Sequence, residues 1–136
     1  MSGPATKRVP IRWRDLDGFN HVNNAVYLSY LEEGRDAWLA ETLGSGITAF
    51  TEFVVRHISI DYVSALTQED GEAIVTVEVE SVGTSSITLR ETITAGSDGR
   101  VAANARGVLV HTNPARDASQ PLPDELRASL QSSISG

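Results

Sequence analysis

The stretch from Asp15 to Asn24 concentrates the side chains of this chain that could carry out chemistry. Its ten consecutive positions, DLDGFNHVNN, hold two carboxylates, one imidazole and three carboxamides, and an apolar pattern with helical spacing begins immediately afterwards. A chain usually enters a buried helix through one capping residue and a turn, so this loop holds more polar groups than a helix start requires. The loop is therefore the first candidate for a functional site.

The position of the loop at the start of a helix points to one kind of chemistry. Asn23 or Asn24 can cap the helix, and the first backbone N–H groups of a helix are unpaired and favour negative charge. Asp17 lies seven residues before Asn24, so a turn can bring its carboxylate to the same place. A carboxylate beside donors aimed at a developing oxyanion is the arrangement that acyl transfer to water requires.

Other interpretations of the same residues remain open. Asp15 and Asp17 can be turn residues bonded to their own backbone, and His21 can be a structural histidine. A metal site built from these three side chains is conceivable, with mixed ligands. A calcium loop is excluded because its twelfth position is Val26 rather than a bidentate glutamate. The chain has neither the G-x-S-x-G motif of a serine hydrolase nor a phosphate-binding G-x-x-x-x-G-K loop.

Length, charge and composition limit the class of protein. The chain has 136 residues, the size of one domain, and we expect residues 1–136 to form a single domain. Its formal net charge of -7 disfavours nucleic acid and anionic membranes as partners. It has no cysteine, no signal-peptide pattern at its start, and no apolar run approaching the ~20 residues that a membrane span needs. These features predict a cytoplasmic protein.

One long helix is predicted directly after the loop. Apolar residues recur at helical spacing from Ala25 to about Leu43. Gly34 in the middle of this segment indicates that another part of the backbone passes close by, because glycine otherwise weakens a helix. The sequence GSGIT then breaks the helix. A group of charged residues within the helix is typical of a solvated face: Glu32, Glu33, Arg35 and Asp36.

Strand patterns occupy most of the remaining chain. The apolar spacing changes to two in four segments that we expect to form an antiparallel meander: residues 53–63, 73–82, 85–95 and 100–112. Residues 7–13 predict a fifth strand, placed at a sheet edge because it contains Pro10. A last amphipathic helix is expected to begin near Pro123. The predicted fold class is α+β, with one helix covered by one sheet.

The sequence DLDGFNHVNNAVYLSYLEE, with one strand before it and four after it, resembles the hotdog-fold thioesterases of the 4-hydroxybenzoyl-CoA thioesterase type. It is most similar to their acyl-CoA branch, which has a D-x-D-x-x-x-H-V-N-N loop. The segments GTSS (83–86) and VLVHTNP (108–114) are also similar, so the resemblance covers roughly residues 7–130. It implies a long central helix wrapped by a five-stranded antiparallel sheet, homodimers or dimers of dimers whose sheets join edge to edge, and sites at the dimer interface.

The resemblance also implies a reaction and roles for individual residues. Asp17 matches the family's catalytic carboxylate, a general base or a nucleophile, and the backbone amide of Asn24 matches the group that polarises the substrate carbonyl. His21 and Asn23 match residues of the acyl-CoA branch that shape the loop and position water. The implied reaction is hydrolysis of an acyl-CoA thioester to the free acid and CoA, with no metal and no other cofactor.

Further side chains are expected to bind the substrate. Where aromatic-CoA members of the family carry basic residues for the nucleotide phosphates, this chain has VGTS, residues 82–85. The phosphates of CoA must then use other groups, and Arg106 is one candidate. The complete set of expected substrate-binding residues is Asp15, Tyr27, Arg56, Ser85, Ser86 and Arg90, with Tyr30 and Leu31 facing the acyl chain.

Three alternatives to an acyl-CoA hydrolase remain. The acyl group can be carried by acyl carrier protein instead of CoA. A dehydratase or hydratase of the same fold also handles acyl thioesters, although its D-x-N-P-x-H motif is absent from the loop. The third alternative is a non-catalytic module that senses acyl-CoA, which would have no need for a carboxylate beside the thioester carbon.

Overall fold

The computed structural model of the protein describes residues 4–43 and 52–134. The strands are β1 (Ala5–Pro10), β2 (Phe53–Tyr62), β3 (Glu72–Val82), β4 (Ser86–Ala95) and β5 (Val101–His111). The helices are α1 (Asn24–Leu43) and α3 (Asp124–Ser132), and short 3-10 turns occupy Trp13–Asp15 and Gln68–Asp70. The GSGIT segment that we expect to break the long helix lies outside the described residues. No helix in these two ranges is long and apolar enough to cross a membrane.

All five strands belong to one antiparallel sheet in the order β1-β3-β4-β5-β2. Strands β3, β4 and β5 form a meander, but the expected four-strand meander is wrong because β2 pairs with β5 at the far edge. The connection from β2 to β3 therefore crosses the end of the sheet, where its Leu66 is completely buried. Strand β1 forms the other edge, as Pro10 predicts. It ends at Pro10 rather than continuing to residue 13, and a 3-10 turn follows.

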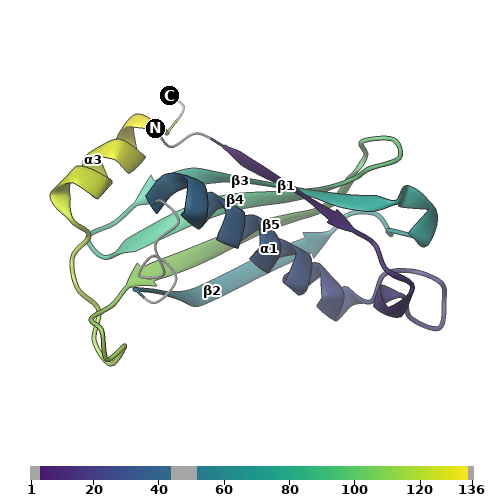
Figure 1. Ribbon diagram of the computed structural model, residues 1–136, viewed down its shortest axis with the longest axis horizontal. Helices are drawn as coiled ribbons and strands as arrows, with labels where there is room; N and C mark the ends of the chain where they lie inside the picture. Colours follow the sequence, from purple (N-terminus) through teal and green to yellow (C-terminus); the bar gives the residue numbers. More distant parts are fainter. Residues whose placement is uncertain (1–3, 44–51, 135–136) are drawn as a thin grey trace.

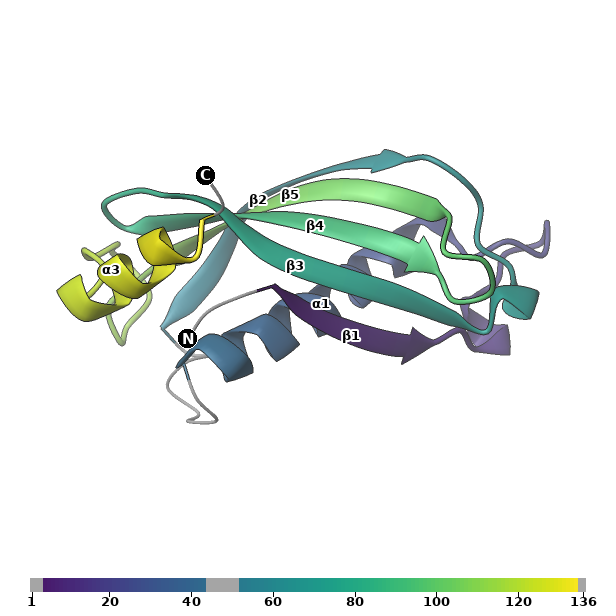
Figure 2. The same ribbon diagram turned by 90° about the horizontal axis from the view of Figure 1, so that it is seen from above.

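Helix α1 lies across one face of the sheet, and the sheet arches over it (Figures 1 and 2). Its buried apolar residues include Tyr27, Tyr30, Leu31 and Trp38. They pack against the inward side chains of the strands, which alternate with outward ones along β3 and β4. This arrangement confirms the α+β fold class and the hotdog fold, with one long helix wrapped by a five-stranded antiparallel sheet.

The close approach indicated by Gly34 exists, but side chains rather than backbone make it. A Cβ atom at Gly34 would overlap Cγ1 of Val75 and lie 3.2 Å from Cγ2 of Val77, both on β3. Helix α3 begins directly after Pro123, as expected, and lies at the end of the sheet where β3 turns into β4 (Figure 2); its Leu130 is buried. Arg127 on this helix donates hydrogen bonds to the carbonyl oxygens of that turn.

Candidate active site

The loop between Asp15 and Asn24 is closed by its own backbone. The N–H of Asp17 donates to the carbonyl oxygen of His21 at 2.7 Å, and the N–H of Asn20 donates to the carbonyl of Asp17 at 3.1 Å. Asn20 adopts the left-handed conformation, with φ at 65°, which asparagine tolerates better than most residues. Leu16 and Val22 form a β-bridge at the base of the loop. The loop is therefore a compact turn whose backbone hydrogen bonds fix the position of Asp17.

The Asp17 carboxylate has one oxygen held and one oxygen available. Its Oδ1 accepts hydrogen bonds from the backbone N–H groups of Phe19 at 2.8 Å and His21 at 3.3 Å. No donor in the described part of the chain reaches Oδ2. The two backbone bonds orient the carboxylate without consuming the second oxygen, which can accept a proton or attack a carbon atom.

Helix α1 begins next to this carboxylate and leaves one of its amides unused. The side-chain oxygen of Asn23 accepts the N–H of Ala25 at 2.8 Å, and the Asn23 carbonyl accepts the N–H of Val26 at 2.9 Å. Asn23 is therefore the capping residue. The N–H of Asn24 meets no acceptor among residues 4–43 and 52–134. This free amide stands at the positive end of the helix dipole, where negative charge is favoured.

A hollow of about 250 Å³ brings these groups together with a segment that is distant in sequence. Asp17, His21 and Asn24 line one side of it, with Tyr27. Residues 62–65 at the end of β2 line the other side, and the hydroxyl of Tyr62 donates to the carbonyl oxygen of Asn24 at 3.0 Å. Sequence reasoning missed this second wall. The only local signal for it is an aromatic residue at the end of a strand, which is too common to identify a site.

Tyr27 fixes the distance between α1 and the second wall. Its hydroxyl accepts the N–H of Leu66 at 3.1 Å and donates to the carbonyl of Ser64 at 3.4 Å. The ring of Tyr62 packs edge-on against it, with 5.1 Å between the ring centroids. Burial raises the pKa of the Tyr27 hydroxyl, so it stays protonated and can keep both bonds. The N–H of Val22 also donates to the carbonyl of Leu66 at 2.8 Å, which joins the two walls directly.

Asp15 lies behind the loop and not in this hollow. Its side chain is almost completely buried, and Oδ2 accepts the hydroxyl of Tyr30 at 2.9 Å and the N–H of Arg12 at 2.9 Å. Burial by itself raises the pKa of Asp15, but the hydrogen bonds from Arg12 and Tyr30 outweigh it and hold this pKa below its ordinary value. The carboxylate expected to bind substrate is thus fully occupied by protein donors.

The expected phosphate-binding residues are scattered over the sheet. Arg90 pairs with Glu78 at 3.1 Å and Arg106 pairs with Glu80 at 2.9 Å, all on the outward side of the strands. Ser85 and Ser86 lie where β3 turns into β4. None of these four residues lines the hollow that contains Asp17. Arg56 differs from them, because it sits at a bulge in the edge strand β2 and has no ionic partner among the described residues.

Asp15, Asp17 and His21 do not form a metal site in this arrangement. No group of three or more His, Asp or Glu side chains in the described ranges is placed to hold a metal ion. Asp15 faces Tyr30 and Arg12, whereas His21 lines the hollow beside Asp17. The mixed-ligand interpretation of the loop therefore has no geometric support.

The fold and the loop define a hotdog-type acyl-transfer enzyme, and comparison with known proteins identifies its family. Residues 11–130 match the family model described as the thioesterase-like superfamily. The chain belongs to this superfamily and is a thioester hydrolase.

Individual relatives agree with this assignment. The chain is 31% identical to the long-chain acyl-CoA thioesterase FadM of Escherichia coli (strain K12) over 129 residues, which is 93% of this chain and 97% of that protein. A thioesterase of Thermus thermophilus, solved with coenzyme A and Zn, is 33% identical with a TM-score of 0.82 and coverage of 94% of this chain and 92% of that chain. A predicted thioesterase from Bacillus stearothermophilus is 25% identical with a TM-score of 0.84, covering 98% of each chain.

Proposed function

We propose that the protein hydrolyses acyl-CoA thioesters and that Asp17 carries the reaction. The observation that supports this most directly is that Asp17 Oδ2 and the Asn24 N–H both lack a hydrogen-bond partner among the described residues, while both residues line the same hollow. A pure binding module has no need to leave a carboxylate oxygen and a helix-terminal amide unpaired beside each other. The long-chain acyl-CoA thioesterase and the CoA-bound thioesterase among the relatives support CoA as the carrier.

The reaction follows from the chemistry of these two groups. The thioester carbonyl oxygen accepts the Asn24 N–H, and Asp17 Oδ2 takes a proton from water as the water oxygen attacks the carbonyl carbon. The amide and the helix dipole stabilise the resulting oxyanion, a contribution of about 3–4 kcal/mol per donor in comparable sites. Collapse of the intermediate breaks the carbon–sulfur bond, and the CoA thiolate leaves and is protonated. Direct attack by Oδ2, giving a mixed anhydride that water then cleaves, uses the same arrangement.

His21 and Asn23 support this site in different ways. The imidazole of His21 lines the hollow and has no hydrogen-bond partner among the described residues, so it can hold the attacking water. Asn23 acts through its cap, which keeps the first turn of α1 and therefore the Asn24 amide in place. Tyr27 and Tyr62 supply the aromatic wall along which the substrate lies.

We also propose that the working unit is at least a homodimer joined through β2. This strand is a sheet edge, and exposed edges are normally covered or paired. It also exposes large side chains, since Val55 is 48% and Tyr62 46% exposed, and Val63 directly after the strand is 55% exposed. Pairing two copies of one edge strand about a two-fold axis removes the edge and covers these side chains.

This dimer supplies a place for the CoA phosphates. Antiparallel pairing of two β2 strands puts the Tyr62 end of one beside the Phe53 end of the other, and so moves the partner subunit's Arg56 toward the hollow. Arg56 borders a second hollow of about 310 Å³ with residues 116–119. An arginine with no ionic partner in the described part of the chain suits the phosphates of CoA, an anion that the net charge of -7 on the whole chain otherwise repels.

A thiol-release assay tests the proposed function. Short, medium, long and aromatic acyl-CoAs are each mixed with the protein, and the appearance of free thiol is followed. We expect turnover of at least one class that is saturable and inhibited by salt, because phosphate contacts are screened by ions. Parallel assays with an acyl-acyl carrier protein and with an enoyl-CoA distinguish the alternatives. Faster turnover of the acyl-acyl carrier protein would identify acyl carrier protein as the carrier of the acyl group. Loss of enoyl absorbance without thiol release would indicate a hydratase. Tight binding of acyl-CoA without any turnover would indicate a non-catalytic module that senses acyl-CoA.

A further inference from the structure

Asp15 and Tyr30 form a contact that the proposed reaction does not use. The Tyr30 hydroxyl donates to Asp15 Oδ2 at 2.9 Å, and the same carboxylate accepts the backbone N–H of Arg12 at 2.9 Å and its guanidinium at 3.1 Å. Tyr30 is 3% exposed and Asp15 is 2% exposed. A carboxylate with this many donors is held firmly, and it belongs to the residue at which the loop begins.

The main chain of Asp15 passes this constraint to the other end of the loop. Its carbonyl oxygen accepts the N–H of Asn23 at 2.9 Å. Asn23 caps α1 and precedes the free amide of Asn24, while Asp17 follows Asp15 by two residues. Asp15 thus connects Tyr30, in the second turn of α1, to both ends of the segment that carries the carboxylate and the amide, through its buried side chain and its own carbonyl oxygen.

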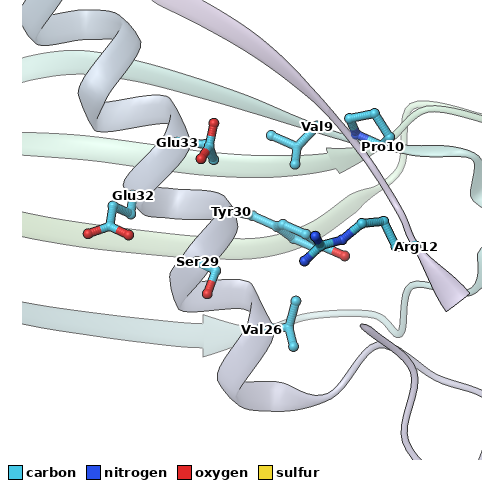
Figure 3. A pocket seen from close by; sticks show the side chains of 8 residues that line it. All are labelled: Val9, Pro10, Arg12, Val26, Ser29, Tyr30, Glu32 and Glu33. Carbon is cyan, nitrogen blue, oxygen red and sulfur yellow. The ribbon is translucent and has the colours of Figure 1, made fainter. Parts of the chain in front are cut away.

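Tyr30 reaches Asp15 from the side of α1 that faces β1. Figure 3 shows the Tyr30 ring extending from the helix toward Arg12, with Val9 and Pro10 of β1 beside it. The hollow drawn in Figure 3 also has a volume of about 250 Å³, but it is a different one. None of its lining residues lines the hollow that contains Asp17. The Tyr30 hydroxyl therefore acts on the loop from behind and does not face the substrate.

We infer that Tyr30 and Asp15 are positioning residues that set the distance between the Asp17 carboxylate and the Asn24 amide. This inference rests on the proposed function for its effect on rate, but not for its effect on the loop. Burial and the neighbouring carboxylate raise the pKa of Tyr30, while that of Asp15 is lowered, so the bond keeps its donor and acceptor across the neutral range. A small displacement of a reacting group is costly, since about 1 Å can reduce a rate by about 100-fold.

The test compares Tyr30→Phe with Ser97→Ala. Phenylalanine keeps the ring and removes only the hydroxyl that reaches Asp15. Ser97→Ala is the matched control, because the Ser97 hydroxyl also donates to a carboxylate, Asp70 Oδ1 at 2.6 Å, in the turn between β4 and β5. We expect Tyr30→Phe to lower kcat by about 10-fold to 100-fold with KM within twofold, and Ser97→Ala to leave both unchanged.

Hydrogen exchange followed by mass spectrometry reads the loop independently of activity. In Tyr30→Phe the amides of residues 16–24 should exchange at least about tenfold faster, while those of β4 stay at the wild-type rate. A third variant, Asp15→Ala, removes the acceptor of the Tyr30 hydroxyl and should reproduce both effects. Because the two substitutions break the same contact, the double variant should be little worse than the more damaging single one.

Several results would overturn the inference. Wild-type kcat in Tyr30→Phe would do so, and so would a lowered kcat with unchanged exchange in residues 16–24, because the phenol would then act on the substrate itself. Fully additive losses in the double variant would show that the two side chains act separately. If the wild-type protein hydrolyses no thioester, the proposed function fails, and the exchange experiment alone still decides whether Tyr30 and Asp15 hold the loop.

Discussion

Replacing Asp17 by asparagine separates a catalytic carboxylate from a structural turn residue. The side chains are nearly the same size, but the carboxamide is neither basic nor negatively charged. If Oδ2 accepts the proton from water or attacks the thioester, Asp17→Asn should lower kcat by at least about 100-fold. Substrate affinity should stay within a few fold, because the walls of the hollow and the Asn24 amide are unchanged.

The structure also predicts a small effect of this substitution on stability. The only hydrogen bonds to the Asp17 side chain from described residues are the two backbone N–H groups that reach Oδ1. The carbonyl oxygen of asparagine can accept both, so we expect the free energy of unfolding to change by less than about 1 kcal/mol. That corresponds to a Tm change below about 5 °C for a domain of this size. Asp17→Ala is the comparison, because it loses both bonds and should cost about 1–3 kcal/mol.

Thiol release and thermal unfolding, measured on the same preparations, decide between the interpretations. The site interpretation requires an asparagine variant that is folded, stable and slow. A structural carboxylate predicts the reverse, with turnover kept per folded molecule and stability lost. An Asp17→Asn protein that is as active as the wild type would refute the catalytic assignment, whatever its Tm.

Three other substitutions probe the fold, the charges and the assembly. Gly34→Ala should destabilise the protein by about 1–3 kcal/mol in urea, because overlap with Val75 outweighs the gain of about 1 kcal/mol in helix propensity. Arg100 holds the pKa of Asp70 well below its ordinary value, so this carboxylate stabilises the fold above the unfolded-state pKa of about 3.9, and the contribution is lost as pH falls through the lowered value. Asp70→Asn should therefore be less stable than wild type at pH 7, and a difference that fails to shrink below about pH 3 would contradict this. Val55→Asp should convert the proposed β2-paired dimer to a folded monomer in light scattering, with an unchanged circular dichroism spectrum.

The elements of the fold could be predicted because their patterns are local. The spacing of apolar residues located α1 and all five strands, and Pro10 located an edge. The position of β2 could not be predicted in the same way. Nothing in the alternating pattern of β2 distinguishes pairing with β3 from pairing with β5, because both give a half-buried antiparallel strand. The two arrangements differ in the connection after β2, which in the structure crosses the end of the sheet and buries Leu66.

The candidate site divides along the same line. Asp17, His21 and Asn24 occur within one short loop, so their meeting at the helix start follows from sequence distance and capping rules. The opposite wall comes from Tyr62, which lies 38 residues from the Asn24 carbonyl to which it donates. The sequence suggests Arg90 as a phosphate-binding residue only because it is an arginine. Its ion pair with Glu78 depends on the register between β3 and β4, which the sequence does not specify.

The clearest difference between the sequence-based expectation and the structure concerns Arg35, which the charge pattern places on a solvated face of the helix. It is 5% exposed, and its guanidinium contacts both carboxylate oxygens of Glu91 at 3.0 and 3.1 Å. Alternation along β4 places Glu91 on the inner face, and Gly107 on β5 leaves room for it, since a Cβ there would lie 3.0 Å from Oε2. Burial raises the pKa of Glu91 despite the cation beside it.

A pair of this kind contributes more to the arrangement of the elements than to net stability. Removing either partner leaves the other charge unpaired in the core and lowers the free energy of unfolding by about 3–5 kcal/mol, whereas replacing both by apolar residues is often neutral. Arg35→Met combined with Glu91→Leu should therefore unfold at a denaturant concentration close to that of the wild type, while Glu91→Leu alone should unfold far earlier. If the pair instead supplied a large net stabilisation, the double variant would be as unstable as the single one. The burial of Arg35 is thus explained by its contact with Glu91 of β4, which joins the helix that carries the site to the centre of the sheet.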